Sequence, residues 1–241
     1  MLLEKEMKLA DVIHHDYNLV PIINRFGIVL GFGDASIESI CINKQINTDF
    51  FLTILNAFHD PQYLDKEHLQ SFSASLLIDY LKKTHNYYLA HKIPEIECLI
   101  NKMESESNNI KNPYQLLQTF FEEYKAELIK HIEREELRVY PYVLELESAV
   151  QKNIKPASLI AKIEDYSISA YEEEHDNVEE KLTDLKNIII KYLAPSENQD
   201  KRFRLLKNLT ELEKDLNDHA SIEDLILVPK VEILEKKILN N

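Results

Sequence analysis

Glycine is scarce in this chain of 241 residues: there are only three, Gly27, Gly31 and Gly33, and they lie close together. Loops that bind dinucleotides or phosphates need glycines at fixed positions between a strand and a helix. The sequence has no such segment, which excludes a Rossmann fold and a phosphate-binding loop. Leu, Ile, Glu and Lys are abundant elsewhere, and no recurring alternation of apolar and polar residues marks strands. The sequence therefore predicts an all-α protein.

Cysteine and long apolar runs are also nearly absent. Cys41 and Cys98 lie far apart, in no spacing typical of metal ligands, which favours a reducing intracellular compartment over a disulfide framework. The first residues, MLLEKEMKLADVIHH, contain early acids and lack the uninterrupted apolar stretch of a signal peptide. No apolar run reaches the length of a transmembrane helix. We therefore expect a cytoplasmic protein.

Positive charge is in deficit, with 28 Lys and Arg against 42 Asp and Glu and a formal net charge of −14. Nucleic acids and anionic membranes are bound chiefly through clustered Lys and Arg. The basic residues here are scattered, and the one basic run, Lys201–Lys207, is more typical of a solvated helix start. The composition argues against nucleic acid and membrane as partners.

The chain divides near Pro61, because the residue before a proline is disfavoured in helical conformation. Residues 1–61 hold all the glycines and several short apolar segments, and we interpret them as a small helical N-terminal domain. Residues 62–241 contain four long segments whose apolar residues recur at steps of three and four. Such stripes are typical of the inward faces of helices in a bundle. We predict an up-down-up-down four-helix bundle.

Four histidines recur at almost equal intervals along these segments: His85, His131, His175 and His219. Each lies roughly midway between the polar stretches that separate the segments. Since the midpoints of antiparallel neighbours meet at the same depth, the four imidazoles are predicted to converge in the core of the bundle. Each histidine interrupts an apolar stripe, and on the first helix the residues predicted to share its face are Leu77, Leu81, Tyr88 and Leu89.

His131 and His219 are each followed four residues later by a glutamate, Glu135 and Glu223 respectively. Residues four apart project from the same face of a helix, so each pair can direct an imidazole and a carboxylate at one point. Four imidazoles and two carboxylates exceed the needs of one four-coordinate zinc ion. Two metal ions that share both glutamates as bridges would use every ligand. A set of imidazoles and carboxylates suits iron, and manganese and zinc are also chemically possible. Such a site would leave coordination positions free for water, an oxo bridge or a small diatomic ligand.

A single histidine on an apolar face is more often a hydrogen-bonded core residue than a ligand. Together, however, four buried imidazoles and two buried carboxylates without metal would cost several kcal/mol in desolvation. The set therefore favours ligands. His91 lies about 240° around the helix from His85 and is expected to be solvated. Glu136 falls off the apolar stripe and is also expected in solvent, whereas Glu179, four residues after His175, is left open between the site and the surface.

The second and fourth helices carry a near-repeat, HIEREELRVYP in His131–Pro141 and HASIEDLILVP in His219–Pro229. The repeat predicts that these helices are related by a pseudo-twofold axis. The prolines lie inside or at the end of helical patterns and are expected to kink or stop the helices beyond the ligands.

At these residues the chain resembles the hemerythrin-like, or HHE cation-binding, family, and within it proteins that repair damaged iron-sulfur centres. The resemblance rests on THNYYLAHKIPEI, HIEREELRVYPYV, EEEHDNV and HASIEDLILVPK. It implies that His85, His131, His175 and His219 are terminal ligands and that Glu135 and Glu223 bridge two irons. Oxygen-carrying hemerythrins typically have a histidine at the position of Glu179 and an aspartate at that of Glu223, so the repair-type pattern fits better.

The N-terminal part resembles the small N-terminal domain of those repair proteins through NLVPIINRFGIVLGFGDASIESIC, residues Asn18–Cys41. That domain often carries two adjacent cysteines. The corresponding stretch of this chain, Val29–Asp34, has none.

The resemblance implies a protein with an oxo-bridged di-iron centre that restores iron to damaged or apo iron-sulfur proteins after nitric oxide or peroxide stress. An alternative is a sensor whose di-iron centre reversibly binds dioxygen or nitric oxide. The ligand count disfavours a purely structural bundle without metal. The sequence does not choose between repair and sensing, nor between a monomer and a homodimer.

Overall fold

The computed structural model describes residues 2–60, 63–105, 111–165, 167–168, 180–193 and 199–240. Within these residues the chain is built from helices, and its one β-bridge, between Lys8 and Ser36, belongs to no strand. The all-α prediction is confirmed. None of the helices in this described part is both long and apolar enough to cross a membrane.

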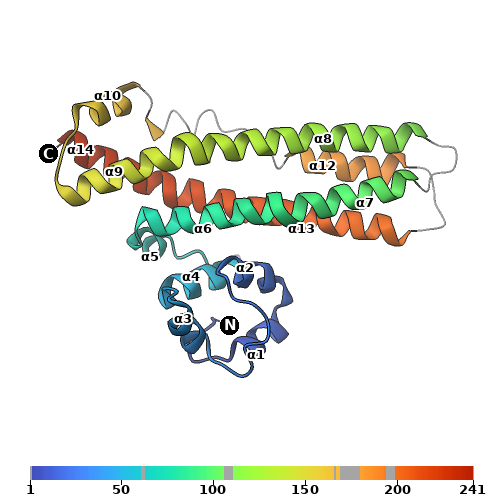
Figure 1. Cartoon of the computed structure of the whole chain (residues 1–241), viewed down its shortest axis with the longest axis horizontal. Coiled ribbons are helices and arrows are strands. Elements are labelled where there is room, and N and C mark those ends of the chain that lie inside the picture. Colours follow the sequence, from blue (N-terminus) through green and yellow to red (C-terminus); the bar gives the residue numbers. More distant parts are fainter. Residues whose placement is uncertain are drawn as a thin grey trace.

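The bundle consists of long helical segments that lie along the longest axis of the molecule, and successive segments run in opposite directions (Figure 1). In its described part each segment contains one π-helical turn, in which the backbone hydrogen bonds span five residues instead of four. In chain order the segments are α6 (Ala74–Tyr87), η2 (Tyr88–Lys92) and α7 (Ile93–Ser105); α8 (Lys111–Arg134), η3 (Glu135–Val139) and α9 (Tyr140–Lys152); α12 (Glu180–Asn187) and η4 (Ile188–Tyr192); and α13 (Asp200–Ile222), η5 (Glu223–Leu227) and α14 (Val228–Asn240).

A buried carboxylate fixes the relative position of the first two segments. Glu147 of α9 is 8% exposed and accepts hydrogen bonds from the backbone N–H groups of Ala74, at 2.6 Å, and Ser75, at 3.0 Å. The Ser73 hydroxyl accepts a third, from Leu76. The first N–H groups of a helix have no partner within the helix, so these contacts stabilise the start of α6. They also tie α6 to α9.

The two prolines of the near-repeat do not stop their helices. Pro141 and Pro229 each lie two residues after a π-helical turn, and the chain continues directly into α9 and α14. A proline ring clashes with the carbonyl four residues before it and has no N–H to donate. The wider π-helical turn before each proline relieves this conflict, and the last N–H before the ring, of Tyr140 or Val228, donates to a carbonyl five residues back. Of the two predicted outcomes, a kink or a stop, the stop is wrong, because both helices continue through the proline.

The N-terminal helices gather beside α6 (Figure 1). They are α1 (Leu9–His15), η1 (Tyr17–Leu19), α2 (Val20–Arg25), α3 (Ile37–Lys44) and α4 (Thr48–His59), and the short helices α5 (Lys66–Ser71) and α10 (Ala157–Asp165) flank the bundle. The Asn47 side chain caps α4 by accepting from the Phe50 N–H at 3.0 Å. The ring of Phe26 stacks on that of Tyr80 in α6, with 5.4 Å between their centroids.

The described residues of the core form two apolar clusters. One joins the N-terminal helices to one end of the bundle and includes Leu81 and Ile222, while the other fills the opposite end and includes Tyr88 and Leu216. In the first segment, residue 85 of α6 lies between Leu81 and Tyr88, the first residue of η2. In α13, residue 219 lies between Leu216 and Ile222. Residues 85 and 219 therefore mark the boundary between the two clusters.

Candidate metal centre

Two histidines and two glutamates meet at this boundary: His85 from α6, Glu135 at the start of η3, His219 from α13 and Glu223 at the start of η5. One ligand atom of each lies within 4.8 Å of the ligand atoms of the others. All four are buried, with 1% to 6% of their surface exposed. Four groups that prefer water have thus been placed together in the core.

The ligand atoms of this group face one another. The Nε2 atom of His85 lies 3.2 Å from Nε2 of His219 and 3.2 Å from Oε2 of Glu135. The Nε2 atom of His219 lies 3.3 Å from Oε2 of Glu223. Imidazole nitrogens and carboxylate oxygens so directed are the donors of transition-metal sites in helical bundles.

His131 joins the group through Glu135. Its Nε2 lies 3.0 Å from Oε1 of Glu135, four residues later on the same helical face. The two oxygens of Glu135 therefore contact histidines from two different helices, as the oxygens of a bridging carboxylate do. His175 and Glu179 lie outside the described residues, so the role of His175 as a ligand stays a prediction.

A π-helical turn begins at each of the two glutamates, at Glu135 in η3 and at Glu223 in η5. Such turns are rare and often mark functional sites, since the extra residue rotates the side chains that follow. The turns coincide with the near-repeat seen in the sequence. The same effect appears on the first helix, where η2 begins at Tyr88: Leu89, predicted to face inward, is 37% exposed, and Lys92 is buried instead.

Two residues that the sequence pattern does not place at the site contact the candidate ligands. The sequence predicts Glu136 in solvent, but its Oε1 atom lies 3.0 Å from Nδ1 of His85. The Tyr140 hydroxyl donates to Oε1 of Glu223 at 2.7 Å, and its ring stacks on His85 with 5.8 Å between centroids. If His85 donates from Nδ1 to Glu136, its Nε2 is left to bind a metal, an arrangement common among metal-binding histidines. The one sequence signal for Glu136 is that an acid follows the glutamate in both copies of the near-repeat.

Comparison with known proteins agrees with this geometry. The profile of the family described as the hemerythrin HHE cation binding domain matches residues 76–231, which include all the predicted ligands. The chain belongs to the hemerythrin HHE family. The family predicted from the ligand motifs is thus confirmed, and with it a metal-binding domain.

A curated relative of this hemerythrin HHE protein is the iron-sulfur cluster repair protein ScdA of Staphylococcus haemolyticus (strain JCSC1435). The two chains are 18% identical over 233 residues, which cover 95% of this chain and 99% of the relative. The similarity therefore extends over the N-terminal helices as well as the bundle.

The electrostatics of the hemerythrin HHE centre favour a bound cation. Burial lowers the pKa of His85, but hydrogen bonds to Glu135 and Glu136 outweigh burial and raise this pKa to about 9. The hydrogen bond with His85 lowers the pKa of Glu136. In the metal-free protein a proton on His85 therefore compensates the buried carboxylates. A metal ion would displace that proton, so binding is coupled to proton release.

The donor set fits a metal ion. Among the described residues, the buried Nδ1 of His219 and Oε2 of Glu223 form no hydrogen bond. A buried carboxylate oxygen without such a bond is unfavourable, since nothing replaces its lost hydration. Coordination to a cation would satisfy this oxygen, and imidazole with carboxylate suits iron, manganese or zinc.

The metal-free protein is expected to lose stability as the pH rises from 6.5 to about 9. Folding raises the pKa of His85 from 6.5 to about 9. The contribution of protonated His85 to the free energy of unfolding is therefore fully present below pH 6.5, and it is lost as the pH rises through the pKa of the folded state. The loss is on the order of 3 kcal/mol. Urea unfolding across this pH range would measure it. Glu136→Gln should reduce the loss, whereas Glu133→Gln, at an exposed position of the same helix, should not; a flat profile for the unaltered protein would contradict the assignment.

Proposed function

We propose that this protein is a non-haem di-iron protein that supplies iron to iron-sulfur centres damaged by nitrosative or oxidative stress. The observation that carries the proposal is the buried group of His85, Glu135, His219 and Glu223, in which Glu135 also contacts His131. The name of the relative, an iron-sulfur cluster repair protein, supports repair as the purpose of this site.

In this proposal the irons would be held by the imidazoles of His85, His131, His175 and His219 and by the carboxylates of Glu135 and Glu223. The bound irons would be exchangeable, so that they can be transferred to an acceptor, and they would also supply redox chemistry. Glu136 holds the His85 ring through Nδ1, and Tyr140 holds Glu223 through Oε1, so that the opposite edge of each ligand faces the site. Such supporting contacts orient ligands and strengthen metal binding.

Release of iron to an acceptor would leave buried carboxylates without a counter-charge. His85 can then take up a proton, because Glu135 and Glu136 hold its pKa at about 9 in the metal-free site. The emptied centre therefore keeps a compensating positive charge and does not have to unfold. Uptake of this proton, which offsets part of the charge lost with the iron, suits a protein whose iron is cargo.

A reducing compartment suits this activity, and we place it in the cytoplasm. Cys41 is buried and Cys98 is exposed, and both are free thiols. Neither lies among the candidate ligands. Iron transfer in this proposal therefore depends on the histidines and glutamates of the bundle.

Iron transfer tests the proposal directly. The iron-loaded protein is incubated without oxygen with an apo iron-sulfur enzyme, cysteine and sulfide, and both the activity of the acceptor and the iron left on the donor are followed. We expect activity to appear as iron leaves the donor. A mock-loaded Glu135→Ala protein, carried through the same steps, controls for free iron.

The alternative function gives a different result in the same experiment. A sensor would keep its iron, leave the acceptor inactive and change its absorption spectrum reversibly with dioxygen or nitric oxide. That outcome would replace repair by sensing while leaving the metal centre itself intact.

A further inference from the structure

A buried ion pair connects the N-terminal helices to the ligand helix α13. Arg25, at the end of α2, binds the carboxylate of Asp215 through Nη2, and 1% of its side chain and 14% of that of Asp215 are exposed. The guanidinium also lies 4.8 Å from the ring centroid of Tyr87 and 5.8 Å from that of Tyr88. Arg25 is thus held both by its ion pair with Asp215 and by contacts with two aromatic rings.

The ion pair reaches the metal centre through Tyr88. The Tyr88 hydroxyl donates to Oδ1 of Asp215 at 3.3 Å, and its ring packs edge-on against His219, with 6.0 Å between centroids. Asp215 lies one helical turn before His219 and so shares its face of α13. Tyr88 therefore packs against His219 from one helical segment, and Asp215 flanks His219 on α13. The positive charge of Arg25 compensates the Asp215 carboxylate and holds it in place.

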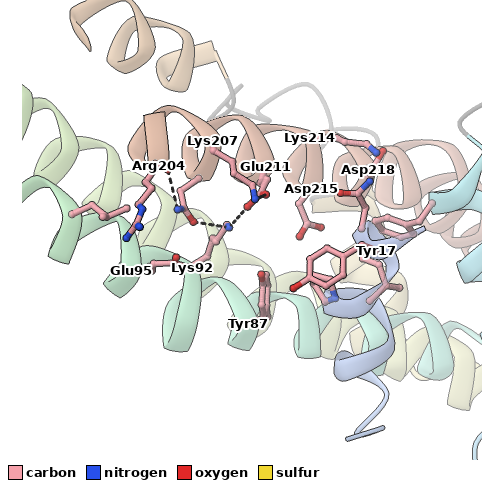
Figure 2. Close-up of a pocket in the computed structure, with 16 residues that line it drawn as sticks. Tyr17, Tyr87, Lys92, Glu95, Arg204, Lys207, Glu211, Lys214, Asp215 and Asp218 are labelled. Atoms are coloured by element: carbon pink, nitrogen blue, oxygen red, sulfur yellow. Dashed lines mark hydrogen bonds and ion pairs between the residues drawn. The ribbon is translucent and has the colours of Figure 1, made fainter. Parts of the chain in front are cut away.

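Asp215 also lines a cavity of about 570 Å³ between the N-terminal helices and the bundle. Figure 2 shows the Asp215 carboxylate on α13, facing the space that Tyr87 and the N-terminal Tyr17 also border. Without Arg25, this carboxylate would be a mostly buried charge with no compensating partner, beside a space in which water can solvate it. A buried charge that loses its partner is strongly destabilised, so Asp215 would move away from Tyr88 and further into the cavity.

We propose that Arg25 is a positioning residue for the metal centre. By holding Asp215, it keeps the acceptor of the Tyr88 hydroxyl in place, and Tyr88 in turn fixes the His219 ring. The N-terminal helices thus control how firmly the centre holds its metal, although they contribute no ligand. This inference rests on the proposed function only where it concerns iron, since the contacts themselves exist without metal.

The rate of iron loss tests this role. Full-length protein is loaded with iron(II) under anaerobic conditions and mixed with an excess of a colorimetric iron(II) chelator. Supporting residues of metal ligands typically change metal affinity by 10-fold to 100-fold, so we expect Arg25→Met to release iron about 10-fold faster than the unaltered protein. Tyr88→Phe keeps the ring but removes the hydroxyl that reaches Asp215, and should release iron several-fold faster. It also provides the test if Arg25→Met fails to fold.

The matched control is Asn56→Ala. Asn56 is buried in α4 and bonds both the N–H and the carbonyl of Leu3, at 2.7 and 3.1 Å, so its loss weakens the N-terminal helices without touching Arg25. We expect Asn56→Ala to unfold more easily and to release iron at the unaltered rate. If Arg25→Met and Tyr88→Phe release iron no faster than Asn56→Ala, the positioning role is wrong.

A second readout needs no metal. In the metal-free protein at fixed pH, the imidazole NMR signals of His219 should shift in Tyr88→Phe and Arg25→Met, but stay in place in Asn56→Ala. Unshifted His219 signals in both variants would overturn the positioning role. If the unaltered protein takes up no iron at all, the proposed function fails, and these NMR signals alone decide the role of Arg25.

Discussion

Replacing Glu135 by Ala is expected to abolish stable metal binding. Glu135 is 1% exposed and contacts both His85 and His131, so its loss removes the link between two ligand helices. Changes to residues that merely support ligands lower metal affinity by 10-fold to 100-fold. If Glu135 is a ligand, as proposed, its loss should lower the affinity by more than about 100-fold. Elemental analysis after anaerobic loading and desalting would measure the metal retained. Glu223→Ala should behave in the same way, because Glu223 occupies the equivalent position of the near-repeat.

His91→Ala is the control for these two variants. His91 belongs to the same helical segment as His85, but it is exposed in η2 and lies outside the group of candidate ligands. Its replacement should leave the metal content unchanged. Comparable loss of metal from His91→Ala would show that the assignment of the inward face is wrong.

Removing the metal is expected to lower the melting temperature of the protein by roughly 10 °C. A ligand present at about 1,000 times its dissociation constant stabilises the folded state by about 4 kcal/mol. For a chain of this size, each kcal/mol changes the melting temperature by about 2 to 4 °C. The ion would bind where carboxylates and imidazoles are already buried together, so little new structure has to form. Scanning calorimetry with and without a strong chelator would measure the shift.

The same chelator should leave the melting temperature of Glu135→Ala unchanged, because that variant has no metal to lose. A shift in Glu135→Ala equal to that of the unaltered protein would mean that the stabilising ion binds elsewhere. The absence of a shift in the unaltered protein would contradict a tightly bound metal.

The convergence of the candidate ligands could be predicted because it depends on regular features of sequence. His85, His131 and His219 lie near helix midpoints, and antiparallel helices bring their midpoints together. Pairs four residues apart, such as His219 and Glu223, share a face of any regular helix. Both arguments use helical periodicity alone, and the structure places these residues as the periodicity predicts.

The departures from prediction arise where the helix is not regular. The π-helical turns at Tyr88 and Glu135 add a residue, so Leu89 turns outward and Glu136 turns toward His85. A constant helical period carries no signal for such turns. The contact between Arg25 and Asp215 joins residues 190 positions apart, and no local pattern predicts it. It depends on how the N-terminal helices pack on the bundle.

The metal content of the purified protein tests the central claim most directly. Elemental analysis after expression in iron-replete medium, together with an absorption spectrum, gives both the identity and the number of bound ions. Six predicted ligands on four helices exceed the needs of one ion, so we expect about two irons per chain, with absorption in the near ultraviolet. One zinc ion per chain, or no metal at all, would contradict the di-iron centre.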